Sequence, residues 1–132
     1  MRIWIIDDHR EIAALTKEKI GDGVPLARVE VFHSIRNALE KTRGPDIALI
    51  DISTICEGVG DHFFSALAKF SHRFPGATII ICSAVANIID KEFREDIEEN
   101  GIENSLHFVQ KGKEFFSDLI ITLREVCGVK KQ

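Results

Sequence analysis

Cysteine is scarce in this 132-residue chain, and its scarcity narrows the classes of site that the chain can hold. The three cysteines, Cys56, Cys82 and Cys127, are odd in number and widely spaced, and no two form a Cys-x-x-Cys pair. Neither a disulfide framework nor a zinc site is therefore favoured. The histidines do not suggest a metal cluster either, because His62 and His72 lie too far apart for one helical face. We expect the three thiols to pack as small apolar groups, with Cys56, in an expected loop, the one to test for reactivity.

Long apolar runs are absent as well. No stretch approaches the roughly 20 residues that a membrane-spanning helix needs, and Asp7 and Asp8 interrupt the only apolar start, which argues against a signal peptide. A net charge of −4 argues against a mainly electrostatic nucleic-acid binder. The length fits one domain, which we expect over residues 1–128 with a short tail at 129–132. A cytoplasmic location, without direct contact to nucleic acid or membrane, is the expectation.

Short apolar runs alternate with amphipathic stretches along the chain. Five runs predict β-strands, namely Arg2–Ile6, Arg28–Phe32, Asp46–Ile50, Ala77–Ser83 and Leu106–Gln110. The fourth is the most continuous, so we expect a central strand covered on both faces.

Each predicted strand is followed by a segment whose apolar residues have helical spacing. The first helix is predicted over Arg10–Ile20 and is expected to end at Gly21-Asp22-Gly23. Ser34 is the expected N-cap of the second. Three more helices carry apolar stripes over residues 63–74, at Val85, Ile89, Phe93 and Ile97, and at Phe116, Leu119, Ile120, Leu123 and Cys127.

This alternation predicts an α/β fold of the (βα)₅ type. Strands that alternate with helices imply right-handed crossovers and a doubly wound, five-stranded parallel sheet with helices on both faces. In such sheets the functional site lies beyond the carboxyl ends of the strands.

Charged and hydroxyl side chains stand at those strand ends. Asp7 and Asp8 follow the first strand, Asp51 the third, Ser83 the fourth and Lys111 the fifth. Three clustered carboxylates repel one another unless a cation lies among them, and an all-oxygen cluster suits Mg²⁺, which prefers to share a phosphate oxygen. The lysine would add a point charge for a phosphate and the serine a hydroxyl donor.

Each residue alone also has a simpler interpretation. Asp7, Asp8 and Ser83 could be helix N-caps, Asp51 could begin a turn, and Lys111 could be a solvated surface lysine. Their common position at the strand ends favours one shared site.

With these residues in place, the chain resembles the receiver domains of two-component response regulators over almost its whole length. The motif elements are Asp7-Asp8, Asp51 closing the strand "IALIDIS", Ser83-Ala84, Phe108 and Lys111. The resemblance implies a flavodoxin-like sheet with strand order 2-1-3-4-5. It also implies that Asp51 is the nucleophile that accepts a phosphoryl group from a partner's phosphohistidine.

The resemblance further implies a Mg²⁺ site and a switch. Asp8, Asp51 and the backbone carbonyl of Ser53 would bind the ion, with Asp7 supporting it through water. The phosphoryl oxygens would be contacted by Ser83 and Lys111, and the switch would consist of Ser83 and Phe108.

The implied partners are proteins. They are a sensor histidine kinase or phosphotransfer protein, and a downstream protein that binds the face made by the fourth helix, fifth strand and fifth helix. Homodimerisation stays open. Any enzymatic activity would be limited to self-catalysed phosphotransfer and dephosphorylation.

Three departures from the family pattern define the alternatives. Gly112 follows Lys111 where a proline is usual, the stretch between Ser83 and Lys111 is longer than usual, and the loop after Asp51 reads "ISTICEGVGD" without the usual Met-Pro. The first alternative is an atypical receiver-like adaptor that binds partners without phosphorylation. A haloacid-dehalogenase-like phosphatase is disfavoured, because Ser53 stands where that class has a second Asp. Whether the chain works alone or was cut from a larger protein stays open.

Overall fold

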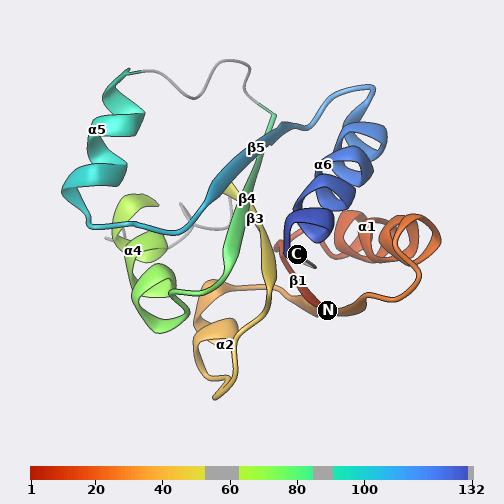
Figure 1. Ribbon diagram of the computed structural model, residues 1–132, viewed down its shortest axis with the longest axis horizontal. Helices are drawn as coiled ribbons and strands as arrows, with labels where there is room; N and C mark the ends of the chain where they lie inside the picture. Colours follow the sequence, from red (N-terminus) through yellow and green to blue (C-terminus); the bar gives the residue numbers. More distant parts are fainter. Residues whose placement is uncertain (53–62, 85–90, 131–132) are drawn as a thin grey trace.

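The computed structural model describes residues 1–52, 63–84 and 91–130 (Figure 1). Five parallel strands form one sheet in the order β2-β1-β3-β4-β5. Their bounds are β1 Arg2–Ile6, β2 Arg28–Phe32, β3 Ile47–Asp51, β4 Thr78–Ser83 and β5 Leu106–Gln110. The predicted (βα)₅ sheet and its strand order are thereby confirmed.

Helices cover both faces of the sheet. Their bounds are α1 Arg10–Gly23, α2 Ile35–Leu39, α4 Phe63–Arg73, α5 Lys91–Glu99 and α6 Phe115–Lys130. In Figure 1, α1 and α6 lie on one side of the sheet, and α2, α4 and α5 lie on the other. None of the helices in the described ranges is long and apolar enough to cross a membrane.

Two hydrophobic cores flank the sheet because successive strand residues point to opposite faces. Ile3 and Ile5 pack toward α1 and α6, whereas Trp4 and Ile6 belong to the core on the other face. All six residues of β4 are buried, so the predicted covering of both its faces is confirmed. It is an internal strand, although β3 occupies the middle of the sheet.

Ser34 caps α2 as predicted, because its hydroxyl accepts a hydrogen bond from the backbone N–H of Asn37 at 3.1 Å. In α6, Leu119, Leu123 and Cys127 of the predicted stripe are buried, and Phe116 and Ile120 pack partly buried against the same core.

The first helix ends within the predicted Gly21-Asp22-Gly23 segment, although its last residue is Gly23 rather than Ile20. Helix α1 runs through Gly21 and ends at Gly23, where the N–H of Val24 bonds to the carbonyl of Ile20 at 2.7 Å. A Cβ on Gly23 would lie 2.9 Å from atoms of Ile120 in α6. The last residue of the helix is therefore a glycine that also permits close packing against α6.

Some predictions fall outside the described ranges. They concern the backbone carbonyl of Ser53, the thiol of Cys56, the helix residues Val85 and Ile89, and the end of the tail at 131–132.

Candidate functional site

The strand register brings Asp7 and Asp51 side by side at the carboxyl edge of the sheet. Ile6, the last residue of β1, pairs with Ile50 of β3, and an aspartate follows each of them: Asp7 directly after β1 and Asp51 at the end of β3. On the other side of Asp51, the neighbouring position of β4 is Cys82. These partners share one face of the pleated sheet, which is the face covered by α1 and α6.

Lys111 reaches this pair from the end of β5. Its ammonium Nζ lies 3.1 Å from Asp7 Oδ2 and also hydrogen-bonds Asp51 Oδ2. The two carboxylate side chains are 6% and 7% exposed, and the lysine side chain is 18% exposed. Burial alone would lower the pKa of Lys111, but hydrogen bonds and charge from Asp51 and Asp7 outweigh it and raise that pKa. One ammonium thus faces two buried carboxylates, which leaves one negative charge that a divalent cation could neutralise.

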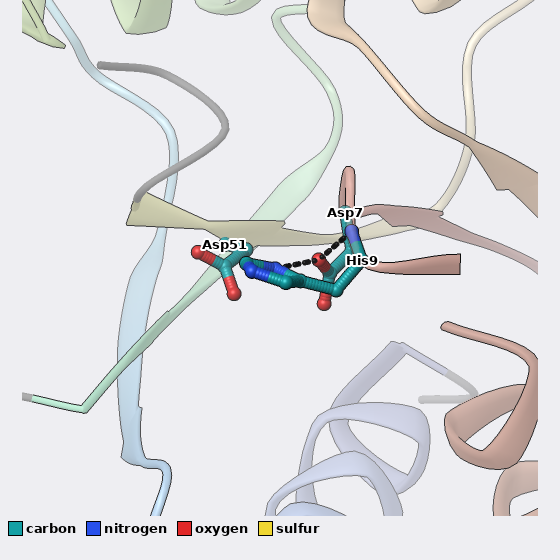
Figure 2. A group of neighbouring side chains, drawn as sticks. All are labelled: Asp7, His9 and Asp51. Atoms are coloured by element: carbon teal, nitrogen blue, oxygen red, sulfur yellow. Dashed lines mark hydrogen bonds and ion pairs between the residues drawn. The ribbon is translucent and has the colours of Figure 1, made fainter. Parts of the chain in front are cut away.

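His9 joins the cluster, although the sequence analysis did not include it. Its ring Nδ1 lies 3.2 Å from Asp7 Oδ1 and 3.1 Å from Asp8 Oδ1. The hydrogen bond to Asp7, followed by the charges of Asp8 and Asp7, raises the pKa of the exposed imidazole. Figure 2 shows the ring beside the Asp7 carboxylate and close to Asp51. Ligand atoms of Asp7, His9 and Asp51 all lie within 4.8 Å of one another, close enough to hold a metal ion.

His9 thus belongs to a candidate metal cluster that the expectation about histidines did not consider. That expectation rested on the spacing of His62 and His72 and overlooked the residue directly after Asp8. The signal in the sequence was the position of His9 at the carboxyl end of the first strand, beside two carboxylates.

Asp8 and Ser83 lie at the rim of the same edge. The side chain of Asp8 is 22% exposed and contacts the ring of His9. Ser83 is buried at the end of β4, and its carbonyl accepts a hydrogen bond from the N–H of Lys111 at 2.7 Å. The backbone of Ser83 therefore helps to fix the start of the loop that carries the lysine.

Phe108 lies on β5, away from the carboxylate cluster. Its half-buried ring packs against the core on the α4 and α5 side, 5.5 Å between centroids from the ring of Phe93. A groove of about 370 Å³ passes these two rings and is lined also by Arg94, Ile97 and Leu106. This packing makes Phe108 part of the core on that face, and its switch role stays a prediction.

The loop after Lys111 is built without proline. The N–H of Gly112 donates to the carbonyl of Gln110 at 3.1 Å, and the carbonyl of Gly112 accepts from the N–H of Phe115 at 3.2 Å. A proline at position 112 could not donate the first of these hydrogen bonds. Because Lys111 still reaches both carboxylates, the departure from the family pattern does not displace the lysine.

Known proteins were compared with the chain at the level of sequence and of structure. No family model and no curated protein matches the sequence. Solved structures do match. The response regulator DrrB of Thermotoga maritima is 17% identical with a TM-score of 0.69, over 98% of this chain and 53% of DrrB. A CheY-like receiver domain protein of Methanospirillum hungatei is 21% identical with a TM-score of 0.70, over 98% of this chain and 96% of that protein.

A third similar structure is the receiver domain of a Francisella response regulator, which is 21% identical with a TM-score of 0.67, over 95% of this chain and 94% of that domain. The chain thus spans about half the length of full-length DrrB and nearly all of the isolated receivers. At these identities the likeness shows the fold, which is the flavodoxin-like receiver fold that the sequence predicted.

Proposed function

We propose that the chain is a phosphoacceptor receiver domain of a two-component or phosphorelay system. Asp51 would accept a phosphoryl group from a sensor histidine kinase or a phosphotransfer protein, with Mg²⁺ as the cofactor. One observation carries the proposal: Lys111 joins Asp7 and Asp51 at the carboxyl edge of a receiver-fold sheet.

The chemistry that these side chains support is an in-line transfer to a carboxylate. An oxygen of Asp51 attacks phosphorus, the bond from phosphorus to the donor's imidazole nitrogen breaks, and the donor imidazole leaves. The ammonium of Lys111 lies where it can offset charge on the transferred group, and the hydroxyl of Ser83 would donate to a phosphoryl oxygen.

The donor set at the strand ends fits Mg²⁺, because carboxylate oxygens are its preferred protein ligands. Asp8, Asp51 and the backbone carbonyl of Ser53 would hold the ion, and Asp7 would support it through water. When bound, the ion supplies positive charge that neutralises the transferring phosphoryl group. The single negative charge that Lys111 leaves among the buried carboxylates is the observation that favours a cation there.

The output would be a change in protein contacts. In this proposal Ser83 follows the phosphoryl group, and Phe108 changes rotamer on the face formed by α5, β5 and α6, where the groove beside Phe93 offers an apolar surface. The domain would consist of residues 1–128 and would lie in the cytoplasm. A downstream protein would bind this face there.

Beryllofluoride, which mimics a phosphoryl group, provides the test. In ¹H–¹⁵N correlation spectra of the wild-type chain with Mg²⁺, we expect beryllofluoride to shift the amide signals of Ser83, Phe108 and Lys111. The matched control is Asp51→Asn, whose spectrum should not respond. A wild-type spectrum that responds to Mg²⁺ but not to beryllofluoride would favour the adaptor that works without phosphorylation.

A further inference from the structure

We propose that His9 is itself a metal ligand at this site and that it shifts the site's preference from Mg²⁺ toward Mn²⁺. The inference rests on the proposed function to the extent that the strand ends must bind a divalent cation. The inference adds one nitrogen donor, the imidazole of His9, to a site whose other donors are oxygen atoms.

The geometry of the cluster carries the inference. The ring nitrogen Nδ1 of His9 lies 3.2 Å from Asp7 Oδ1 and 3.1 Å from Asp8 Oδ1. Two ligands on one edge of an octahedron with bonds of about 2.1 Å lie roughly 3.0 Å apart. The 3.1 Å between His9 Nδ1 and Asp8 Oδ1 is therefore short enough for both atoms to bind one ion, in place of the ion pair that they form here. Asp51 lies within reach of the same ion, because its ligand atom is within 4.8 Å of those of Asp7 and His9 (Figure 2).

The imidazole of His9 contacts the carboxylates of Asp7 and Asp8 and does not cap helix α1. His9 occupies the N-cap position of α1, yet its side chain makes no capping hydrogen bond. The turn is held by the backbone instead, since the N–H of His9 donates to Asp7 Oδ1 at 2.9 Å. The side chain is 55% exposed, so replacing it leaves the turn and the core in place.

Ligand chemistry sets the direction of the preference. Mg²⁺ binds oxygen and keeps several waters, so an imidazole adds little to its affinity. Imidazole nitrogen suits first-row transition-metal ions better than it suits Mg²⁺, and Mn²⁺, which binds carboxylate oxygen as Mg²⁺ does, is the ion of that row closest to Mg²⁺ in its preferred ligands. A site with two or three carboxylates and one histidine should therefore hold Mn²⁺ more tightly than the same site without the histidine, with a smaller effect on Mg²⁺.

The test compares Mn²⁺ and Mg²⁺ binding to the full chain in three forms: wild type, His9→Ala and His33→Ala. His33 is the matched control, because its Nδ1 contacts the backbone carbonyl oxygen of Asp7, at 3.0 Å, rather than a carboxylate. Electron paramagnetic resonance reports free Mn²⁺, competition reports Mg²⁺, and electron spin-echo modulation detects nitrogen bonded to Mn²⁺. We expect His9→Ala to lower Mn²⁺ affinity about tenfold or more, to lower Mg²⁺ affinity less than about threefold, and to remove the nitrogen modulation. His33→Ala should keep all three properties.

Two failures are distinguishable. If the wild type binds both ions but His9→Ala leaves the Mn²⁺ to Mg²⁺ affinity ratio and the nitrogen modulation unchanged, the inference is wrong while the proposed function stands. If the wild type binds neither ion, the inference and the Mg²⁺ requirement of the proposed function both fail.

Discussion

Removing the ammonium of Lys111 should expose how much it contributes to stability. In Lys111→Met the side chain keeps its length, and the carboxylates of Asp7 and Asp51 lose their shared partner while they stay 6% and 7% exposed. Deleting one member of a buried ion pair costs about 3–5 kcal/mol. The lysine side chain is 18% exposed, so water screens part of the remaining repulsion, and we expect a loss of about 2 kcal/mol.

Urea unfolding at neutral pH in EDTA measures this loss. With an m-value of about 2 kcal/mol/M, the midpoint should fall by roughly 1 M. Added Mg²⁺ should recover part of the loss, because the ion supplies positive charge to the same carboxylates. The control is Lys113→Met in the same loop, where the lysine is exposed and the change should stay within about 0.5 kcal/mol. An unchanged midpoint for Lys111→Met in EDTA would refute the account of the charge cluster.

Three further predictions concern the metal, a buried thiol and a tight contact. Asp8→Ala should weaken Mg²⁺ binding about tenfold or more in a calorimetric titration, and an unchanged titration would count against Asp8 as a ligand. Burial raises the pKa of Cys82 from 9.0 to about 12, so the stability that its neutral thiol contributes is present below pH 9 and is lost as the pH rises toward 12. At pH 9, iodoacetamide should label Cys82 at least about a hundredfold more slowly in the native chain than in urea. Peptide mapping measures the two rates, and equal rates would contradict the burial of Cys82. Gly44→Ala places a Cβ 2.5 Å from the buried ring of Phe74 and should lower the free energy of unfolding by about 1–3 kcal/mol. In Gly21→Ala, within α1, the added Cβ meets no atom of another element within 4 Å, and the free energy of unfolding should rise by about 0.5–1 kcal/mol. Urea unfolding measures both changes.

The strands were predictable from the sequence because buried parallel strands are nearly continuous runs of apolar, often β-branched residues. Their bounds were predicted within one residue. Asp46 was assigned to a strand but lies just before β3, where its side chain accepts a hydrogen bond from the N–H of Arg2 at 2.8 Å. Ala77 likewise lies one residue before β4, whose pairing with β3 begins at Thr78. Runs of apolar residues locate strands well, but they do not identify the residue at which the ladder starts.

Helix ends were harder to predict, because glycine has more than one role. Gly21-Asp22-Gly23 was interpreted as a stop signal, and α1 ends at Gly23, but a Cβ at position 23 would also lie 2.9 Å from atoms of Ile120. That contact joins residues almost a hundred positions apart, and no local pattern reveals it. Tertiary packing thus adds a second reason for glycine at this helix end, beside its local preference for helix ends.

The residues of the site that follow directly from the strand ends were predictable from the sequence. The prediction was incomplete where membership in the site depends on the direction of a side chain. The convergence of Asp7, Asp51 and Lys111 follows from parallel strands whose carboxyl ends meet at one edge. The direction of the imidazole of His9 depends on the turn into α1, where its N–H bonds to Asp7. That turn is a three-dimensional feature, and the spacing of residues alone does not specify it.

The most direct test of the proposed phosphoacceptor is the mass of the intact chain after incubation with acetyl phosphate and Mg²⁺. Wild type and Asp51→Asn are compared, each with and without EDTA. We expect the wild type to gain one phosphoryl group only when Mg²⁺ is present, and Asp51→Asn to gain none. A gain of the same size in Asp51→Asn would contradict the assignment of the acceptor, and a wild type that stays unmodified even with its histidine-phosphorylated donor would contradict the proposed function.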